Sequence, residues 1–263
     1  MLQFEQSIMS ILKNKIPILE FDTDREAVIM PDHEQLGIKL PEKAVFVFLG
    51  DAVDRYAEEN DTRIVSSFES ATKNFPAYIL NYQGEEICLM QAPVGAAAAV
   101  QILDWLAAYG VKKVISSGSC GALQHFDENV FLIPCKALRD EGTSYHYAAP
   151  SRFIDISSEA RAAIEKSLTR HGLKYKEVVT WSTDGFFRET KEKTAYRLSE
   201  GCEVVEMECS ALAACAQMRG IVWGELLYTA DTLADTDQYD QRGWGKDSVE
   251  IALKLSLDAV RLL

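Results

Sequence analysis

Short apolar runs alternate along the chain with longer segments in which apolar residues recur at helical spacing. The run at 44–49 is continuously apolar and is bounded by a proline and a glycine, which is typical of a strand buried on both faces. Residues 96–109 favour a helix that Gly110 can terminate. A second buried strand at 111–117 follows, so the three segments predict a βαβ unit with parallel strands.

The same pattern predicts the other elements of the chain. Further strands are predicted at 77–80, 87–92, 130–135, 176–180, 202–206 and 222–229. Further helices are predicted at 52–60, 157–171, 188–199, 208–219 and 246–262. This alternation of strands and helices predicts a three-layer α/β/α fold with a mixed central sheet.

The N-terminal segment has a different pattern. Residues 4–13 have the spacing of a short amphipathic helix, and residues 17–31 are expected to be an extended lead-in that packs or makes a subunit contact. No repeat, low-complexity tract or linker divides the remaining chain. We therefore expect an N-terminal helix and lead-in over 1–30 and a single domain over 31–263.

Composition and charge exclude several classes of partner. The chain of 263 residues has 27 basic and 40 acidic side chains, a formal charge of -13, which makes nucleic acid and membrane surfaces poor partners. An anionic substrate would need a local cluster of Arg, Lys or backbone N–H groups. The six cysteines stand singly without zinc-ligand spacing, and neither a signal peptide nor a run of ~18 apolar residues is present. A cytoplasmic protein with reduced thiols and no metal is expected.

Candidate chemistry is sought where strands end, because ligands of α/β sheets bind at the carboxyl ends of the strands. The small-residue run 116–121 follows such a strand and includes Gly118 and Ser119, whose N–H groups can cradle a phosphate or a ribose. A tight turn packed under a helix is an equally good interpretation of this run.

Two carboxylates, Glu206 and Glu208, stand where the strand at 202–206 meets the next helix. The positive end of the helix dipole stabilises anions there, and one carboxylate can accept hydrogen bonds from two adjacent hydroxyls. The pair can therefore bind a sugar diol. The alternative is that both are ordinary first-turn glutamates that favour the helix.

Aromatic and acidic residues follow two other strands. Phe186 and Phe187 come after an Asp-Gly turn and can stack on a heterocycle, although one of the two is expected to be a core residue. Asp231 follows the apolar strand that ends near Leu227 and can donate a proton if it is partly buried, the alternative being a cap or turn. His146 lies among aromatic residues and is expected to be packed.

Taken together, these stretches resemble the nucleoside phosphorylase family of the purine and uridine type, most closely its uridine-phosphorylase-like branch, from about His33 to the C-terminus. The segment Val205–Glu208 is similar to the family's ribose-binding signature. The resemblance implies that Glu208 binds the 2′- and 3′-hydroxyls, with Met207 under the sugar.

The same resemblance implies functional roles for three other residues. Phe186 matches the residue that stacks on the base, and Asp231 matches the residue that protonates the departing base in purine-cleaving relatives. His33 matches a ligand of the 5′-hydroxyl that reaches into a neighbouring subunit. The resemblance therefore implies a homodimer or homohexamer with shared active sites.

The phosphate site departs from the family pattern. The two positions at which the phosphorylases have arginine are Asp54 and Ser116 here. Arg55 can replace the first arginine by a shift of one residue, whereas an acidic residue at the position of Asp54 activates water in hydrolytic relatives. The remaining phosphate contacts match Gly50, Gly118 and Ser119. The residues that read uracil in uridine phosphorylases correspond to Thr190 and Glu192, so the resemblance does not identify the base.

The expected function is phosphorolysis of a ribonucleoside, uridine-like or purine, to free base and ribose 1-phosphate, with phosphate as co-substrate and no cofactor. One alternative is a hydrolytic nucleosidase in which Asp54 activates water, and another is a catalytically weak nucleoside-binding protein. A dinucleotide-binding oxidoreductase is disfavoured because residues 50–55 lack the glycines that a pyrophosphate needs. Arg242, in the loop 234–244, is a candidate contact to base or phosphate if that loop is a flap and not a solvated surface loop.

Overall fold

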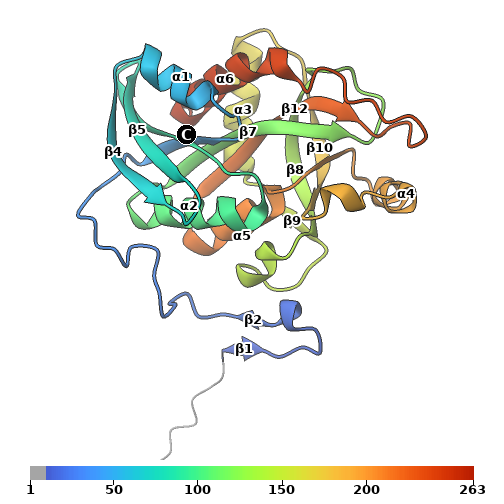
Figure 1. The fold of residues 1–263 in the computed structure, drawn as a ribbon, viewed down its shortest axis with the longest axis horizontal. Helices are drawn as coiled ribbons and strands as arrows, with labels where there is room; N and C mark the ends of the chain where they lie inside the picture. The colour runs from blue at the N-terminus through green and yellow to red at the C-terminus, as the bar shows by residue number, and fades with distance from the viewer. Residues whose placement is uncertain (1–9) are drawn as a thin grey trace, which may run out of the picture.

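The computed structural model describes residues 10–263, and ten strands of this part of the chain form one sheet (Figure 1). The strands are β3 (Lys43–Val47), β4 (Thr62–Glu69), β5 (Asn74–Tyr82), β6 (Glu85–Gln91), β7 (Lys113–Ala122), β8 (Phe131–Asp140), β9 (Phe153–Asp155), β10 (Tyr175–Thr183), β11 (Val204–Glu206) and β12 (Val222–Thr232). The α-helices are α1 (Ala52–Glu59), α2 (Ala96–Ala108), α3 (Ser158–Arg170), α4 (Lys191–Ser199), α5 (Cys209–Arg219) and α6 (Val249–Arg261).

The sheet is mixed and partly closed. Its order is β11-β10-β8-β12-β7-β3-β6-β5-β4, with β9 paired to β8. The strands β10, β7 and β3 each have parallel neighbours, whereas β12 is antiparallel to β8. Because β11 pairs with both β10 and β7, the strands β7, β12, β8, β10 and β11 form a closed ring. This closure holds the end of β7 directly against β11.

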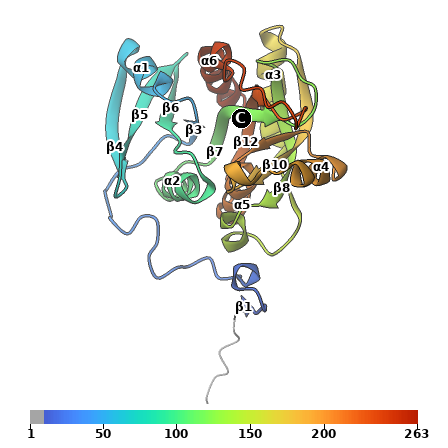
Figure 2. The same ribbon diagram turned by 45° about the vertical axis from the view of Figure 1, so that its right-hand side comes forward.

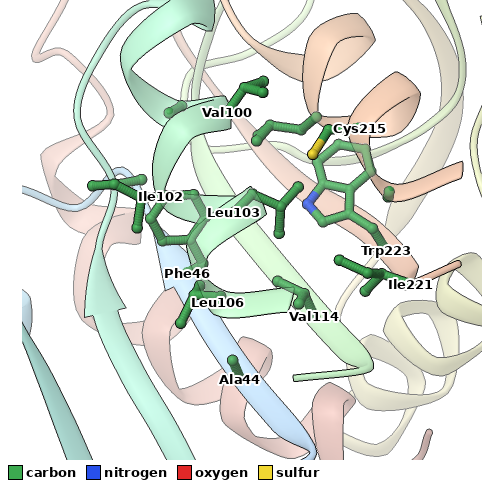
Figure 3. Packing of buried hydrophobic residues seen from close by; sticks show 14 of the residues in the cluster. Ala44, Phe46, Val100, Ile102, Leu103, Leu106, Val114, Cys215, Ile221 and Trp223 are labelled. Atoms are coloured by element: carbon green, nitrogen blue, oxygen red, sulfur yellow. The ribbon is translucent and has the colours of Figure 1, made fainter. Parts of the chain in front are cut away.

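Helices cover both faces of the sheet, which confirms the predicted three-layer α/β/α fold (Figures 1 and 2). On one face, α2 and α5 pack on side chains such as Phe46, Val114 and Trp223 (Figure 3). On the other face, α3 and α6 pack on residues that include Val45 and Ile115. Adjacent residues of one strand thus enter different cores, as the alternation of side chains along a strand requires.

The predicted helices of the domain are all present, each with ends within three residues of the prediction. Two strands of the ten-stranded sheet, β4 and β9, were not predicted. The strand β4 is at the edge of the sheet, and its sequence mixes polar and apolar residues without a buried run. The strand β9 has only three residues. Both therefore lack the continuous apolar pattern that identified the central strands.

The prediction of an N-terminal helix at residues 4–13 is wrong over the part of this segment that the structure describes. Residues 1–9 lie outside the described part of the chain, but Ile11–Leu12 form a strand, β1, that pairs with β2 (Phe21–Asp22). Backbone pairing of Ile11 with Asp22 replaces the helical hydrogen bonds. Figure 1 shows this segment as an extended arm that leaves the body before β3.

Within residues 10–263, no helix has the length and apolar character needed to cross a bilayer.

Candidate active site

A cavity of about 180 Å³ lies where β7, β11 and β12 end and α5 begins. It adjoins a second cavity of about 510 Å³. Both are lined by Phe186, Glu189, Asp231 and Trp244. We call the smaller one the inner cavity and the larger one the outer cavity. Their position at the carboxyl ends of parallel strands is the one that the sequence pattern predicted for a ligand.

Glu206 lines the inner cavity, but its carboxylate is already satisfied by the protein. One oxygen accepts hydrogen bonds from the hydroxyls of Thr180 at 3.1 Å and Ser182 at 2.6 Å. The other accepts from the backbone N–H groups of Glu208 and Cys209, both at 2.6 Å. Glu206 thus joins β10, β11 and the first turn of α5. The structure favours this role over the direct ribose contact predicted for it.

Glu208 is placed differently at the same junction. It is the residue before α5, and its carboxylate accepts a hydrogen bond from the backbone N–H of Gly95 at 2.5 Å. Burial, and then the charge of Glu206, raise the pKa of Glu208 to about 8. The structure gives this carboxylate one protein donor where Glu206 has four, so it retains capacity to accept hydrogen bonds from a ligand. Met207 also lines the inner cavity.

A third carboxyl group, that of Glu225 on β12, also lines the inner cavity. It is buried, and its Oε2 atom has no hydrogen-bond partner. Burial, and then the charges of Glu206 and Glu208, raise its pKa. Within the described part of the chain, no group of three or more His, Cys, Asp or Glu side chains is arranged to hold a metal ion. The three glutamates are therefore a set of separate carboxyl groups around the cavity.

Asp231 and Glu189 form an acidic pair between the two cavities. Asp231 is 5% exposed, and burial raises its pKa although a hydrogen bond from Tyr239 opposes the rise. Burial, followed by the charge of Asp231, raises the pKa of Glu189 to about 7. Gly121 of β7 makes room for this arrangement, because an added Cβ there would lie 3.3 Å from the Oδ1 atom of Asp231. A carboxyl group with a raised pKa can carry a proton for transfer.

Aromatic side chains line the approach to these carboxyl groups. Phe186 lines both cavities and is 41% exposed, while Phe187 lines only the outer one and is 92% exposed. The expectation that one of the two is a core residue is therefore wrong. Their rings meet edge to face with centroids 4.9 Å apart. Trp244 also lines both cavities. A planar heterocycle between the two cavities would therefore contact Phe186 and Trp244.

The residues predicted to bind phosphate are only partly brought together. Gly118 and Ser119 line the inner cavity, but Gly50 and Arg55 do not. Arg55 forms ion pairs with Asp51 at 2.5 Å and Glu250 at 2.6 Å, which hold it on the surface near α6. Gly50 lies in the exposed turn before α1. Over residues 10–263, no Lys or Arg lines the inner cavity.

Asp54, the predicted water-activating residue of the hydrolytic alternative, also lies outside both cavities. Its carboxylate accepts a hydrogen bond from the Tyr78 hydroxyl at 2.9 Å. The other departure from the family pattern, Ser116, is buried and accepts a hydrogen bond from the Trp223 indole at 3.0 Å. Neither residue is available to a ligand of the inner cavity in this chain.

His33 and Arg242 lie away from the inner cavity. His33 lines a separate cavity of about 340 Å³ near Trp105 and Tyr147, with Nδ1 2.9 Å from the carbonyl oxygen of Met30. Its contribution to a neighbouring subunit stays a prediction. Arg242 donates a hydrogen bond to the carbonyl of Phe126 at 2.8 Å, and its charge lowers the pKa of Asp231. Arg242 thus acts on Asp231 from a position outside both cavities.

Sequence reasoning missed four residues of the site: Gly95, Glu189, Glu225 and Trp244. Glu225 could have been found from the sequence, since it is the single charged residue of the strand predicted at 222–229. Gly95 contributes through its backbone N–H, for which no side-chain pattern exists. Glu189 and Trp244 come from connecting segments whose path depends on the whole fold.

Comparison with known proteins gives a consistent result. The family model of the phosphorylase superfamily matches residues 42–260. A guanosine phosphorylase of Halorubrum lacusprofundi is 26% identical over 225 residues, which are 80% of this chain and 89% of that protein. The match therefore spans most of both chains.

Solved structures with the same fold include a phosphorylase and a nucleosidase. A uridine phosphorylase of Vibrio fischeri has a TM-score of 0.74 at 21% identity, covering 90% of this chain and 99% of that one. An AMP nucleosidase of Bacteroides thetaiotaomicron has a TM-score of 0.69 at 23% identity, covering 84% and 88%. At these identities the likeness establishes the fold.

Proposed function

Because the chain belongs to the phosphorylase superfamily, we propose that it cleaves the N-glycosidic bond of a ribonucleoside and releases the free base. The observation that carries this proposal is the placement of Glu208 at the start of α5, beside Met207 and with a single protein donor. The names of the relatives support a purine or uridine nucleoside as substrate.

In this proposal, Glu208 binds the 2′- and 3′-hydroxyls of the ribose. An ionised carboxylate accepts one hydrogen bond from each of two adjacent hydroxyls, and Glu208 has the free capacity to do so. As the glycosidic bond breaks, the sugar gains positive charge. Glu208 stabilises that charge, so the interaction is stronger in the transition state than in the bound substrate.

The base lies between the two cavities, where Phe186 and Trp244 can contact its faces. Asp231 then donates a proton to the departing base. Burial supports this role because it raises the pKa of Asp231 and favours the protonated form. Since a catalytically weak nucleoside-binding protein does not need this donor, loss of Asp231 distinguishes the two functions by its effect on turnover.

Two nucleophiles are compatible with this arrangement of sugar and base. Phosphate is the one expected from the family, and Gly118 and Ser119 line the cavity where it would bind. Water is the second candidate, and a specific observation favours it: among the described residues, neither Lys nor Arg lines the inner cavity. His33 of a neighbouring subunit remains our proposed ligand for the 5′-hydroxyl, in a homo-oligomer with shared active sites.

The test is release of free base from a panel of purine and pyrimidine ribonucleosides, with and without phosphate. Glu208→Ala should lower kcat/KM by about 100-fold or more, because each hydrogen bond to a charged group contributes about 1.5–3 kcal/mol. Glu203→Ala is the control, since Glu203 is paired with Lys176 outside the cavities and should leave the rate unchanged. The proposal fails if the native enzyme releases no base, or if both variants are equally active.

A further inference from the structure

Glu189 lies where the two cavities meet, and the proposed function gives it no role. Of the residues that the structure describes, four line both cavities: the aromatic residues Phe186 and Trp244 and the acidic residues Glu189 and Asp231. Asp231 is the proposed proton donor to the base, and its carboxyl group accepts a hydrogen bond from Tyr239. The Glu189 carboxyl group faces the same place, so a base bound there meets it as well.

The backbone on both sides of Glu189 is held in place. Glu189 lies between the single helical turn Phe186–Arg188 and the helix α4. The N–H of Arg188 donates to the carbonyl of Gly185 at 2.7 Å, and the N–H of Thr190 donates to the carbonyl of Arg188 at 2.9 Å. Thr190 then caps the first turn of α4 with its side chain. The local structure therefore fixes where the Glu189 side chain enters the cavities.

The Glu189 carboxyl group has unused capacity to accept hydrogen bonds. Burial, and then the charge of Asp231, raise its pKa to about 7, and no hydrogen bond from the described residues lowers it. Lys193 lowers this pKa through its charge alone, because it forms an ion pair with Asp140 at 2.6 Å. Tyr239 is a further titratable group close enough to feel the charge of Glu189. Both oxygens of the Glu189 carboxylate can therefore accept hydrogen bonds from a ligand.

The edges of the common bases differ in how they meet a carboxylate. Guanine presents two adjacent donors, the N1–H and the 2-amino group, which match the two oxygens of one carboxylate. Hypoxanthine presents the N1–H alone. Adenine presents an acceptor at N1 beside its 6-amino group, and uracil has a carbonyl acceptor on each side of its N3–H. Because a carboxylate repels an acceptor that faces it, Glu189 favours guanine over the other three bases.

The rest of the lining also disfavours uracil. Over residues 10–263, no Asn, Gln or Arg side chain lines either cavity, so the two carbonyl groups of uracil meet no amide or guanidinium donor. Lys191 lines the outer cavity, but it is ion-paired with Asp237. The outer cavity of about 510 Å³ leaves room for a base of two rings.

We infer that Glu189 selects the base, and that the preferred substrate is a ribonucleoside of a 2-amino-6-oxopurine, of the guanosine type. The carboxylate accepts hydrogen bonds from the N1–H and the 2-amino group while the ring lies between Phe186 and Trp244. This inference rests on the proposed function and names its substrate class. Glu189 binds the base and takes no part in breaking the glycosidic bond, so its loss changes the choice among bases.

The first test compares kcat/KM of the native full-length protein for guanosine, inosine, adenosine and uridine, with and without inorganic phosphate. Guanosine should be the best substrate. Inosine should be about 10-fold or more poorer, because it lacks one of the two donors to a charged acceptor, and adenosine and uridine should be poorer still. If adenosine or uridine is as good a substrate as guanosine, the inference is wrong and the proposed function stands. If no base is released from any of the four, both are wrong.

The second test is Glu189→Gln, which keeps the size of the side chain but replaces one acceptor by an amide donor. We expect kcat/KM for guanosine to fall by about 10-fold or more, mainly through a higher KM, because the new N–H faces the 2-amino group. Inosine should lose less, since the amide oxygen still accepts from its N1–H. Glu192→Gln is the matched control: Glu192 is an exposed residue of α4 outside both cavities, and this variant should keep the native preference. An unchanged preference in Glu189→Gln, or an equal loss for all nucleosides, would overturn the assignment.

The third test is the pH dependence of the preference, measured as the ratio of kcat/KM for guanosine to kcat/KM for adenosine. The ratio should rise as the pH increases through about 7, because the pKa of Glu189 is raised to about 7 and only the ionised carboxylate accepts both hydrogen bonds. Ionisations that both substrates require, such as those of Glu208 and Asp231, cancel in the ratio. In Glu189→Gln the ratio should not depend on pH over this range. A native ratio that stays constant or falls would contradict the role of Glu189.

Discussion

Glu206 and Glu208 carry the same functional group two residues apart, yet their surroundings give them different properties. Glu206 accepts four hydrogen bonds from the protein, so its oxygens serve the junction between β11 and α5. Glu208 accepts one, from Gly95, and faces the inner cavity. The number of protein donors, and not the residue type, determines which carboxylate can bind a ligand.

The raised pKa of Glu208 predicts the pH dependence of the reaction. Glu208 must be ionised to accept two hydroxyl protons, and its pKa is raised to about 8. Because native Asp231 must also be protonated, the ionisation of Glu208 is followed in the Asp231→Asn variant, in which that acid no longer titrates. There kcat/KM should increase with pH up to and through this value. The measurement is a pH profile of base release. A profile that is flat over this range, or that falls as pH rises towards 8, would contradict the role of Glu208.

A variant of Glu206 tests the cause of this shift. The charge of Glu206 raises the pKa of both Glu208 and Glu225, so Glu206→Gln should move the rise of the profile to lower pH. Glu189→Gln is the control because the charge next to Glu189 is that of Asp231, and the rise should stay in place.

At the scale of elements, the position of Glu225 depends on how closely β12 packs against α3. Gly224 precedes Glu225 on β12, and a Cβ added there would lie only 2.6 Å from the Cβ of Ala160 on α3. No other residue fits without a shift of the strand or the helix. This contact therefore fixes the strand that carries Glu225 and ends near Asp231.

Gly224→Ala should reduce the free energy of unfolding by about 1–3 kcal/mol, as expected for overpacking of a buried contact. Denaturant unfolding of Gly224→Ala, Ala160→Gly and the double variant would measure it. We expect the double variant to be more stable than the sum of the two single effects predicts, because Ala160→Gly removes the atom that clashes. If the two single effects on the free energy of unfolding simply add, the added methyl group is accommodated by a shift elsewhere and not by loss of the Ala160 Cβ.

At the scale of the whole molecule, the strands and helices with a regular apolar pattern were predictable. The strand pairing that closes the sheet beside the site was not. The strands at β3 and β7 and the helix α2 follow from local apolar patterns. The pairing of β11 with β7, by contrast, joins residues such as Val205 and Gly121 that are far apart in the sequence. No local pattern contains that pairing.

The candidate site divides in the same way. Glu208, Phe186 and Asp231 were predictable because each stands where a strand ends, and the fold brings them to one cavity. Arg55 and Asp54 were predicted from their positions relative to the family pattern, but their side chains bind Glu250 and Tyr78 instead. Side-chain partners of this kind depend on packing between distant elements, which spacing along the chain does not encode.

The most direct test of the central claim is a crystal structure of the protein with a ribonucleoside bound in the Asp231→Asn variant, which lacks the proposed proton donor. The account predicts the ribose in the inner cavity, with its 2′- and 3′-hydroxyl oxygens within about 3 Å of the Glu208 carboxylate. It also predicts the base between Phe186 and Trp244. A nucleoside bound elsewhere, or a ribose whose hydroxyls contact other groups while Glu208 stays paired only with Gly95, would contradict it.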